Sequence, residues 1–389
     1  MRNVYFSSGN IITSLGFSTD ENAAAMLSGR VGIRIYNDPG LYPGPVPVSR
    51  VDDERLNREF EIIRTNNSRL GLSDDQFSRL EKMLFCSITS ALENSPADPS
   101  DPRTLFIIST TKGNIDLLAC RPGDVKGRLH LWELAGFIAQ LFNCSQQPFV
   151  ISSACISGSV ALITAARMIA SGKYDHAIVT GGDIVSEFVV SGFMSFQALS
   201  PDPCKPFDAS RTGLSIGEGC GTVIMSVNPE VADGQAPVRY LGGAVSNDAN
   251  HISGPSRDGE GLYLSIAAAM REAGVSAGDI DFISAHGTAT PYNDEMESLA
   301  LAWAGLDNVP VNSFKGYIGH TLGAAGIIET ILSLYSMQNN VLIQSAGYTE
   351  NGVSKPLHIL TENTTQTIRN VLKTASGFGG CNAALVVGQ

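Results

Sequence analysis

The chain has 389 residues, of which 43% are hydrophobic and 16% are charged, against a typical charged share of about 25%. This balance predicts a large buried interior and excludes a disordered protein, a coiled coil or a repeat array with a large solvated face. The net charge of −12 excludes a general electrostatic attraction to nucleic acid or to an anionic membrane surface.

The location of the protein is indicated by its apolar runs and its cysteines. No run approaches the roughly 18 apolar residues of a membrane span, and polar residues interrupt the first segment, so we expect neither membrane insertion nor a signal peptide. The seven cysteines are dispersed and form no Cys-x-x-Cys pair. We therefore expect reduced thiols in the cytoplasm, with no disulfide framework and no structural zinc.

Short β-branched apolar runs alternate with longer stretches of helical period along the chain. This pattern predicts an α/β fold of βαβ units around a mostly parallel sheet. Strands are expected at 105–109, 149–152, 177–181, 221–227, 282–285 and 384–387. Helices are expected at 73–92, 156–171, 260–273, 294–303 and 321–338.

A polar, turn-rich segment at 228–237 predicts a boundary between an N-terminal part, 1–230, and a C-terminal part, 231–389. The two parts resemble each other weakly. The helices expected at 156–171 and 321–338 are both apolar on nearly all sides and rich in small residues, which is typical of buried helices. Each follows a potentially reactive residue, Cys155 or His320, and this is a hint of duplication.

Cys155 lies where an apolar strand turns into a helix. A helix N-terminus carries about half a positive charge and unpaired N–H groups, so it is expected to lower the pKa of the thiol and to donate to an oxyanion. The alternative is a small buried hydrophobic residue, which is the usual role of a cysteine.

Two of the six histidines have a comparable setting. His286 follows an apolar strand and precedes a Gly/Thr loop, which is where ligands bind in α/β sheets. His320 precedes a predicted helix, whose dipole disfavours imidazolium. A structural role is the alternative for both.

Five motifs, taken in order, make the chain resemble the β-ketoacyl-acyl-carrier-protein synthases of the elongating Cys-His-His type, in the thiolase superfamily. The resemblance runs from residue 9 to residue 382 and is strongest from Cys155 onward. The motifs are Ser-Ala-Cys ending at Cys155; Pro206-Phe207-Asp208 with Arg211, Gly213 and Gly217-Glu218-Gly219; His286-Gly287-Thr288-Ala289-Thr290 with Asp294 and Glu297; Lys315 and Gly319-His320 with Gly323-Ala324-Ala325-Gly326 and Glu329; and 377–382.

The resemblance implies a decarboxylative Claisen condensation. Cys155 would accept an acyl chain, and His286 and His320 would stabilise the enolate formed when malonyl-carrier loses CO₂. The oxyanion of acyl-Cys155 would bind the backbone N–H groups of Cys155 and Phe378. No metal and no redox cofactor are implied.

Supporting roles follow from the same resemblance. Lys315 would polarise the histidine pair, and Phe378 would be a mobile gate over the nucleophile. Substrate contacts are implied for Thr288, Thr290, Phe378, Ile156 and Phe193, and support of the site for Glu329, Asp294 and Glu297. The implied fold has five layers, αβαβα, built from two pseudo-duplicated halves.

The chain departs from the family pattern at three positions. Ile156 stands where a small or hydroxyl residue is usual, Ala289 replaces a glycine, and Ser376 stands where a second Phe is frequent. These departures bear on the acyl group accepted and not on the chemistry.

Two other classes stay open as alternatives. A degradative thiolase uses a second cysteine near the C-terminal Gly-rich loop, where Cys381 lies, and a chain-length-factor-like partner subunit is non-catalytic. Against them stand the Lys315/His320 pattern and the intact nucleophile.

The resemblance implies acyl carrier protein as partner and a homodimer, or a heterodimer with a related subunit. Because carrier proteins are acidic, a local basic cluster must dock them. The candidates are Arg64, Arg69, Lys126, Arg128 and Lys205.

Overall fold

A computed structural model describes the whole chain except residues 1, 67–75, 94, 120–127, 230–235 and 252–253. Its described residues form a ten-stranded sheet with the order β11-β10-β14-β15-β9-β1-β8-β6-β4-β5. The strands are β1 (Val4–Ile12), β4 (Thr104–Ser109), β5 (Phe149–Ile151), β6 (His176–Asp183), β8 (Gly219–Ser226), β9 (Arg239–Asn247), β10 (Phe282–Ser284), β11 (Val311–Asn312), β14 (Asn370–Gly377) and β15 (Cys381–Gly388).

The sheet consists of two halves with the same topology. The order β1-β8-β6-β4-β5 in one half is repeated as β9-β15-β14-β10-β11 in the other. In each half the first two neighbouring pairs are antiparallel and the last two are parallel. An antiparallel pair between β1 and β9 joins the halves. The duplication expected from the two small-residue helices is therefore present in the fold.

The expectation of a mostly parallel sheet was wrong. In each half the last strand returns antiparallel beside its predecessor, as β15 does after the short turn that follows Gly377. The connection is short between β14 and β15, whereas the longer segment 184–218 joins β6 to β8, and an antiparallel neighbour allows either length. The result is a mixed sheet.

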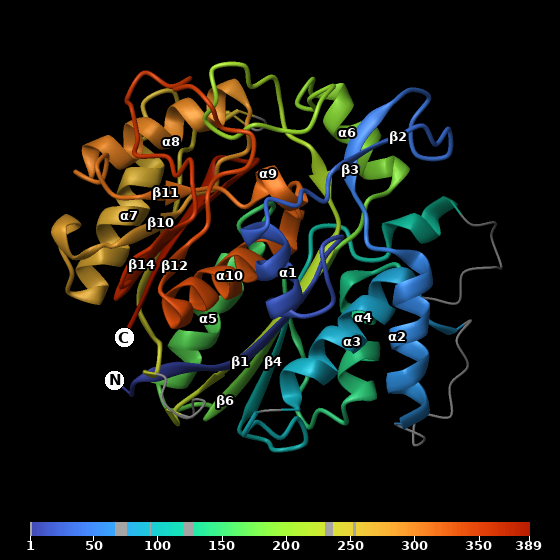
Figure 1. Ribbon diagram of the computed structural model, residues 1–389. Helices are drawn as coiled ribbons and strands as arrows, with labels where there is room; N and C mark the ends of the chain where they lie inside the picture. The colour runs from blue at the N-terminus through green and yellow to red at the C-terminus, as the bar shows by residue number, and fades with distance from the viewer. Residues whose placement is uncertain (1, 67–75, 94, 120–127, 230–235, 252–253) are drawn as a thin grey trace.

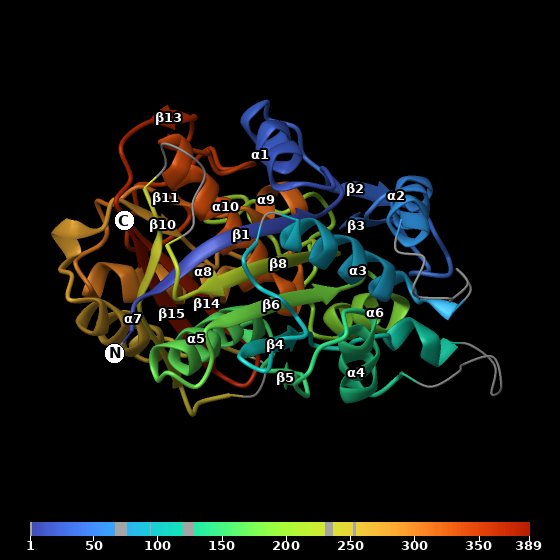
Figure 2. The same cartoon turned by 90° about the horizontal axis from the view of Figure 1, so that it is seen from below.

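Helices cover both faces of each half and give the five layers that the resemblance implied (Figure 1). The central layer is α5 (Ser157–Ala170) and α10 (Ala325–Asn339), which contact each other and strands of both halves. On one outer side α3 (Arg79–Leu92) packs on β1, β6 and β8, beside α4 (Leu131–Leu141). On the other, α7 (Glu260–Ala273) packs on β9 and β15, beside α8 (Pro291–Trp303). Figure 2 shows the strands from below.

Glycines allow the two central helices to approach closely. A Cβ on Gly158 would lie 2.8 Å from the backbone N of Ile327, and one on Gly326 would lie 2.3 Å from the backbone N of Ser159. Because real Cβ atoms do not come so near to backbone, the contact requires glycine on both helices. This is why small residues mark both segments in the sequence.

All six predicted strands are present, but two helices begin later than expected. α3 begins at Arg79, because Ser78 and Glu81 form a capping box there, and part of the predicted start lies in 67–75, outside the described residues. α10 begins at Ala325, after the 3₁₀ turn η5 (Leu322–Ala324), where Leu322 has a φ of 52°. The sequence patterns did not predict β1, β9 and β14.

The remaining elements complete the fold around the sheet. They are α1 (Thr19–Leu27), β2 (Arg34–Tyr36), β3 (Val46–Ser49), α2 (Asp53–Asn66), η3 (Ile115–Ala119), α6 (Glu187–Ser195), β7 (Ile216–Gly217), η4 (Ala277–Asp279), α9 (Lys315–Ile318), β12 (Val341–Leu342) and β13 (Thr364–Thr365). No helix in the described ranges is both long enough and apolar enough to cross a bilayer. The centre of the predicted boundary, 230–235, lies outside the described residues.

Candidate active site

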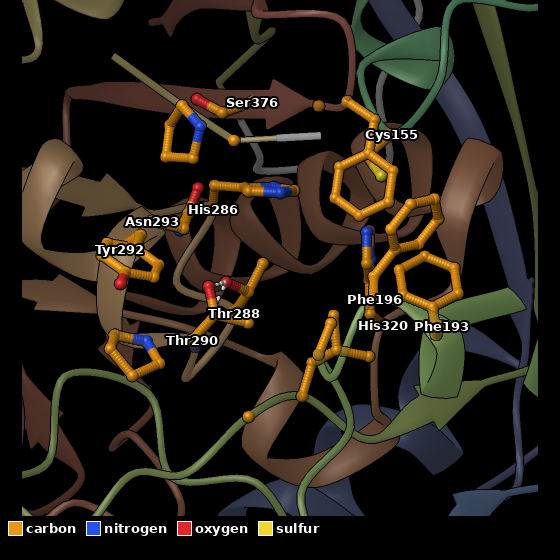
Figure 3. Close-up of a pocket in the computed structure, with 18 of the residues that line it drawn as sticks. Cys155, Phe193, Phe196, His286, Thr288, Thr290, Tyr292, Asn293, His320 and Ser376 are labelled. Atoms are coloured by element: carbon orange, nitrogen blue, oxygen red, sulfur yellow. Dashed lines mark hydrogen bonds between the residues drawn. The ribbon is translucent and has the colours of Figure 1, made fainter. Parts of the chain in front are cut away.

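A cavity of about 320 Å³ brings Cys155, His286 and His320 together, although they lie far apart in the sequence. Figure 3 shows the side chains of the two histidines and Cys155 around the same space. Other lining residues include Phe193, Phe196, Thr288, Thr290, Tyr292, Asn293, Ser376 and Phe378.

Cys155 and His320 lie at equivalent junctions of the duplicated topology. Cys155 follows β5 and precedes α5, and His320 follows β11 and α9 and precedes α10. Since α5 and α10 pack side by side in the central layer, these two junctions meet. The duplication therefore places a nucleophile from one half beside an imidazole from the other.

The turn that carries Cys155 is tightly bonded. Ala154 has a φ of 45°, Ser157 Oγ donates to the Ala154 carbonyl at 2.6 Å, and the Ser153 N–H donates to Ser157 Oγ at 2.8 Å. Ile156 occupies the N-cap, so Cys155 precedes the helix by two residues. Burial raises the pKa of the Cys155 thiol to about 12. The expectation that the helix lowers this pKa was wrong, because desolvation is the larger effect.

His286 is held by a carboxylate beneath its backbone. Glu297 of α8 accepts hydrogen bonds from the N–H of His286 at 2.8 Å and from the N–H of Gly287 at 2.7 Å. The His286 N–H also approaches Thr374 Oγ1, at 3.2 Å. The sequence predicted only that Glu297 lies near the start of a helix. In the structure its carboxylate holds the backbone of the loop that carries the imidazole.

The two imidazoles face each other in a buried setting. Their ring centroids lie 5.2 Å apart with an interplanar angle of 87°, and both side chains are buried. Neither ring nitrogen of His320 has a hydrogen-bond partner within the described part of the chain. Burial, and then the nearby charge of Lys315, lowers the pKa of both histidines well below 6.5. Both rings are therefore neutral near pH 7.

Lys315 connects His286 to Glu329. Its Nζ lies 3.4 Å from His286 Nδ1, donates to the His286 carbonyl at 2.5 Å, and pairs with Glu329 Oε1 at 2.6 Å. An ammonium has no acceptor, so Nδ1 must be unprotonated when it faces Lys315. This places the proton of His286 on Nε2.

A second buried lysine, Lys373 of β14, pairs with Glu329 Oε2 at 2.6 Å. The sequence motifs did not predict this lysine. The signal was present, because a lysine inside the apolar run of a buried strand is rare unless it is paired.

The loop after His286 is fixed by Asp294. Its carboxylate accepts from the backbone N–H groups of Thr288, Ala289 and Phe207, at distances from 2.7 to 3.2 Å. Thr288 and Thr290 line the cavity and their hydroxyls lie 2.9 Å apart. Burial raises the pKa of Asp294 to about 6.

Aromatic rings cover the cavity near Cys155. The Phe378 ring stacks on Phe193, with centroids 5.5 Å apart, and meets Phe196 edge-on at 5.2 Å. Phe193 and Phe196 come from the end of α6 (Figure 3). The sequence did not predict that Phe196 lines the cavity, because no motif distinguishes it from any other aromatic residue at the end of a helix.

Two of the positions that depart from the family pattern, Ile156 and Ser376, differ in their relation to the cavity. Ile156 is fully buried in the core cluster of the central layer and does not line the cavity. Ser376 lines it, with its hydroxyl bonded to Asn382 Oδ1 at 2.8 Å. Cys381 is half-buried, and its Sγ lies 3.3 Å from the Phe378 carbonyl.

Of the docking candidates, Arg69 and Lys126 lie outside the described residues. Arg64 pairs with Glu61 at 2.6 Å. Arg128 forms two bonds, of 2.6 and 2.9 Å, to the buried carboxylate of Glu81. Lys205 is the candidate with a neutral partner, the Ser210 hydroxyl at 3.2 Å.

Comparison with known families gives two adjacent matches. Residues 11–228 match the model of the β-ketoacyl synthase N-terminal domain, and residues 239–349 match that of the β-ketoacyl synthase C-terminal domain. Together they span most of the chain.

Individual relatives agree with these matches. The chain is 34% identical to the 3-oxoacyl-[acyl-carrier-protein] synthase 2 of Rhizobium meliloti over 61% of this chain and 59% of that protein. It is 25% identical to a 3-oxoacyl-[acyl-carrier-protein] synthase homolog of Saccharomyces cerevisiae over 99% of this chain and 98% of that protein. The matches to the first three curated relatives span 59% to 65% of those proteins' length.

A solved structure is similar over the whole chain. It belongs to the complex of a ketosynthase with its chain length factor from Xenorhabdus doucetiae, and the TM-score is 0.85 at 27% identity, covering 100% of this chain and 98% of that one.

Proposed function

Because the chain belongs to the β-ketoacyl synthase family, we propose that it catalyses the decarboxylative condensation of an acyl group with a malonyl group carried by acyl carrier protein. The observation that carries this proposal is the convergence of Cys155, His286 and His320 on one cavity, with Lys315 directing the His286 proton to Nε2. In this proposal residues 1–230 supply the nucleophile and residues 231–389 supply both histidines.

The first step loads the enzyme. Cys155 Sγ attacks the acyl thioester of the carrier, the bond from the acyl carbon to the pantetheine sulfur breaks, and the leaving thiolate takes the proton of the Cys155 thiol. The raised pKa of the Cys155 thiol keeps it protonated in the resting enzyme, so its one proton passes to the leaving thiolate and no separate base has to take it up. The backbone N–H groups of Cys155 and Phe378 hold the oxyanion; a Cβ on the neighbouring Gly377 would lie 3.0 Å from the Cys155 nitrogen, which shows how close these segments are.

The second step breaks a carbon–carbon bond in the malonyl group. CO₂ leaves, and its bonding electrons move into the thioester as an enolate. A neutral imidazole donates an N–H to the enolate oxygen without adding a charge to the buried site. The lowered pKa values of His286 and His320 keep both rings neutral. The enolate carbon then attacks the acyl carbon on Cys155 and breaks its bond to sulfur, and the Cys155 thiolate released takes a proton from water to restore the thiol.

Substrate positioning is assigned to the loop that Asp294 fixes and to the aromatic cover. Thr288 and Thr290 hydrogen-bond the pantetheine arm. Phe378 opens as a gate when the acyl chain enters, and Phe193 borders the acyl group. The reaction requires no metal and no redox cofactor.

The alternatives are not favoured. A thiolase needs a second cysteine as base, and Cys381 instead directs its Sγ at the carbonyls of Phe378 and Ser153, at 3.3 and 3.8 Å. A chain-length-factor-like subunit has no use for an intact nucleophile. As partners we propose acyl carrier protein and a second subunit, identical or related, in the cytoplasm.

Intact-protein mass spectrometry tests the proposal. The protein is incubated with a panel of acyl-carrier proteins, and one acyl mass should appear in the wild type and in Cys220→Ala, but not in Cys155→Ala. Addition of malonyl-carrier should then remove that mass and yield CO₂ and a β-ketoacyl-carrier. Absence of acylation across the panel, or condensation by Cys155→Ala, would overturn the proposal.

A further inference from the structure

Lys373 is a fully buried charge that the proposed reaction does not use. It lies in β14 opposite Ser284 of β10, and its side chain reaches Glu329 of α10 in the central layer. Removing an ammonium from water costs several kcal/mol unless its partners replace the lost hydration. A lysine at this depth therefore requires an explanation.

The Lys373 ammonium has one ion-pair partner and two hydrogen-bond acceptors. Nζ pairs with Glu329 Oε2 at 2.6 Å and donates to the carbonyls of Thr374 at 2.5 Å and Ser284 at 3.2 Å. Thr374 is itself a neighbour of His286. Its Oγ1 donates to Glu297 Oε1 at 2.6 Å and lies 3.2 Å from the backbone nitrogen of His286. Lys373 is thus bonded to the residues that surround His286.

The Glu329 carboxylate is shared between two ammonium groups. Oε1 receives Lys315 at 2.6 Å and Oε2 receives Lys373 at 2.6 Å. With one carboxylate and two ammonium groups, this cluster carries one net positive charge. Other charged or titratable groups around the imidazoles are Glu297 and Asp294 on α8, Asp183 on β6 and Cys155 before α5.

We propose, on the basis of the function above, that Lys373 is a positioning residue for the histidine pair. By occupying the Glu329 oxygen that Lys315 does not use, it holds the carboxylate at both ends and keeps Lys315 against His286 Nδ1. It also leaves the cluster with the net positive charge that disfavours protonation of either imidazole.

The electrostatics of the site agree with this role. After burial, the charges of Lys315 and Lys373 both lower the pKa of His286 and of His320. Without Lys373, Lys315 and Glu329 would form a neutral pair, and the two imidazoles would face less positive charge. Protonation of the rings at mildly acidic pH would then remove the neutral donors from the reaction.

The test uses Lys373→Met, which has a similar length and no charge, with Lys373→Arg as the charge-retaining variant. The control is Lys173→Met, in the turn that follows α5, where the side chain is exposed. Release of CO₂ from malonyl-pantetheine is followed from pH 5 to 8, since this substrate needs no docking surface. In Lys373→Met the acid limb should move up by about one pH unit, so the rate on that limb falls about tenfold relative to wild type. Lys373→Arg and Lys173→Met should keep the wild-type limb.

A second variant separates charge from packing. Lys373→Met/Glu329→Gln again has one net positive charge, now on Lys315, so its acid limb should return toward that of wild type. Histidine ¹⁵N chemical shifts, recorded over the same pH range, report ring protonation without any turnover. The inference is overturned if Lys373→Met lowers the rate equally at every pH and leaves the histidine shifts unchanged. If the wild type itself releases no CO₂, the proposed function fails, while the histidine shifts still test the charge of the cluster.

Discussion

The imidazoles of His286 and His320 meet edge to face, with centroids 5.2 Å apart, and each comes from a different strand-to-helix connection of the C-terminal half. The carboxylate of Glu297 fixes the backbone at His286, and the carbonyl of Ser215 accepts the N–H of His320 at 2.8 Å. Two rings held through their backbones keep their orientation while their outer nitrogens stay available to a substrate oxygen.

Removal of either ring should slow decarboxylation. His286→Ala and His320→Ala are expected to reduce CO₂ release from malonyl-carrier by about 10²- to 10³-fold, because each loses a pre-oriented donor to the enolate. Single-turnover release of labelled CO₂ measures the effect. Rates equal to wild type in both variants would show that the histidines are structural.

Loss of the nucleophile should have a different outcome. Cys155→Ala is expected to lose acylation and condensation but to keep decarboxylation, since the enolate donors are the histidines and not the thiol. The same labelled-CO₂ assay, run beside product analysis, distinguishes the two activities. A parallel loss of both activities in a folded variant would place Cys155 in the decarboxylation step as well.

Stability should fall in mild acid. The pKa values of His286 and His320 lie below 6.5 in the folded protein, so below pH 6.5 the unfolded chain binds protons that the folded chain does not. The free energy of unfolding should therefore rise with pH up to about 6.5 and decline below it. Urea titrations from pH 5 to 8 measure this slope. A double variant, His286→Gln/His320→Gln, should show a smaller slope over the same range.

Ala289 occupies the left-handed region, with a φ of 64° and no exposed surface. Glycine avoids the strain of about 1–2 kcal/mol that this conformation imposes on other residues. Ala289→Gly should therefore cost less stability, by about 1 kcal/mol, than Ala285→Gly, which removes a methyl group that is equally buried but lies at an ordinary φ. Denaturant midpoints compare the two, and equal losses would contradict the prediction.

Two basic residues should behave in opposite ways. Lys205→Glu is expected to raise the KM for acyl-carrier several-fold at low salt, less so once the Debye length falls to about 8 Å, and to leave turnover of a short pantetheine thioester unchanged. Arg128→Glu would place a second carboxylate against buried Glu81 and should destabilise the fold by about 3–5 kcal/mol. A stable Arg128→Glu enzyme with a raised KM for carrier would reassign Arg128 to docking.

The sequence predicted the elements that have strong periodicity and the residues that sit in specific motifs. Cys155 could be predicted because it lies between an apolar strand and a helix, and His286 and His320 because each lies beside a glycine at the end of a predicted strand or the start of a predicted helix. The sequence did not predict β1, β9 and β14, because their polar and apolar residues follow no simple alternation. Each of these strands is buried on both faces along part of its length and on fewer positions along the rest, so its burial has no period of two.

Interactions between segments distant in the chain were beyond the sequence patterns. The pKa of Cys155 depends on how deeply the completed fold buries the thiol, so a local helix argument gave the wrong direction. The charge that balances Lys373 is that of Glu329, which reaches it from another layer. Arg128 looked like a free surface charge because its partner, Glu81, lies on α3, 47 residues earlier in the chain.

The duplicated topology also sets an order of assembly. On the ribosome the half with Cys155 is complete, from β1 to β8, before the residues of β10, α9 and the turn after β14 have been made. If the first half folds as a unit, its thiol spends this interval without the Phe378 cover and without either imidazole. We expect a nascent chain halted near residue 230 to react with a thiol reagent at Cys155 faster than the finished protein does, because the half made last completes the shielding of the nucleophile.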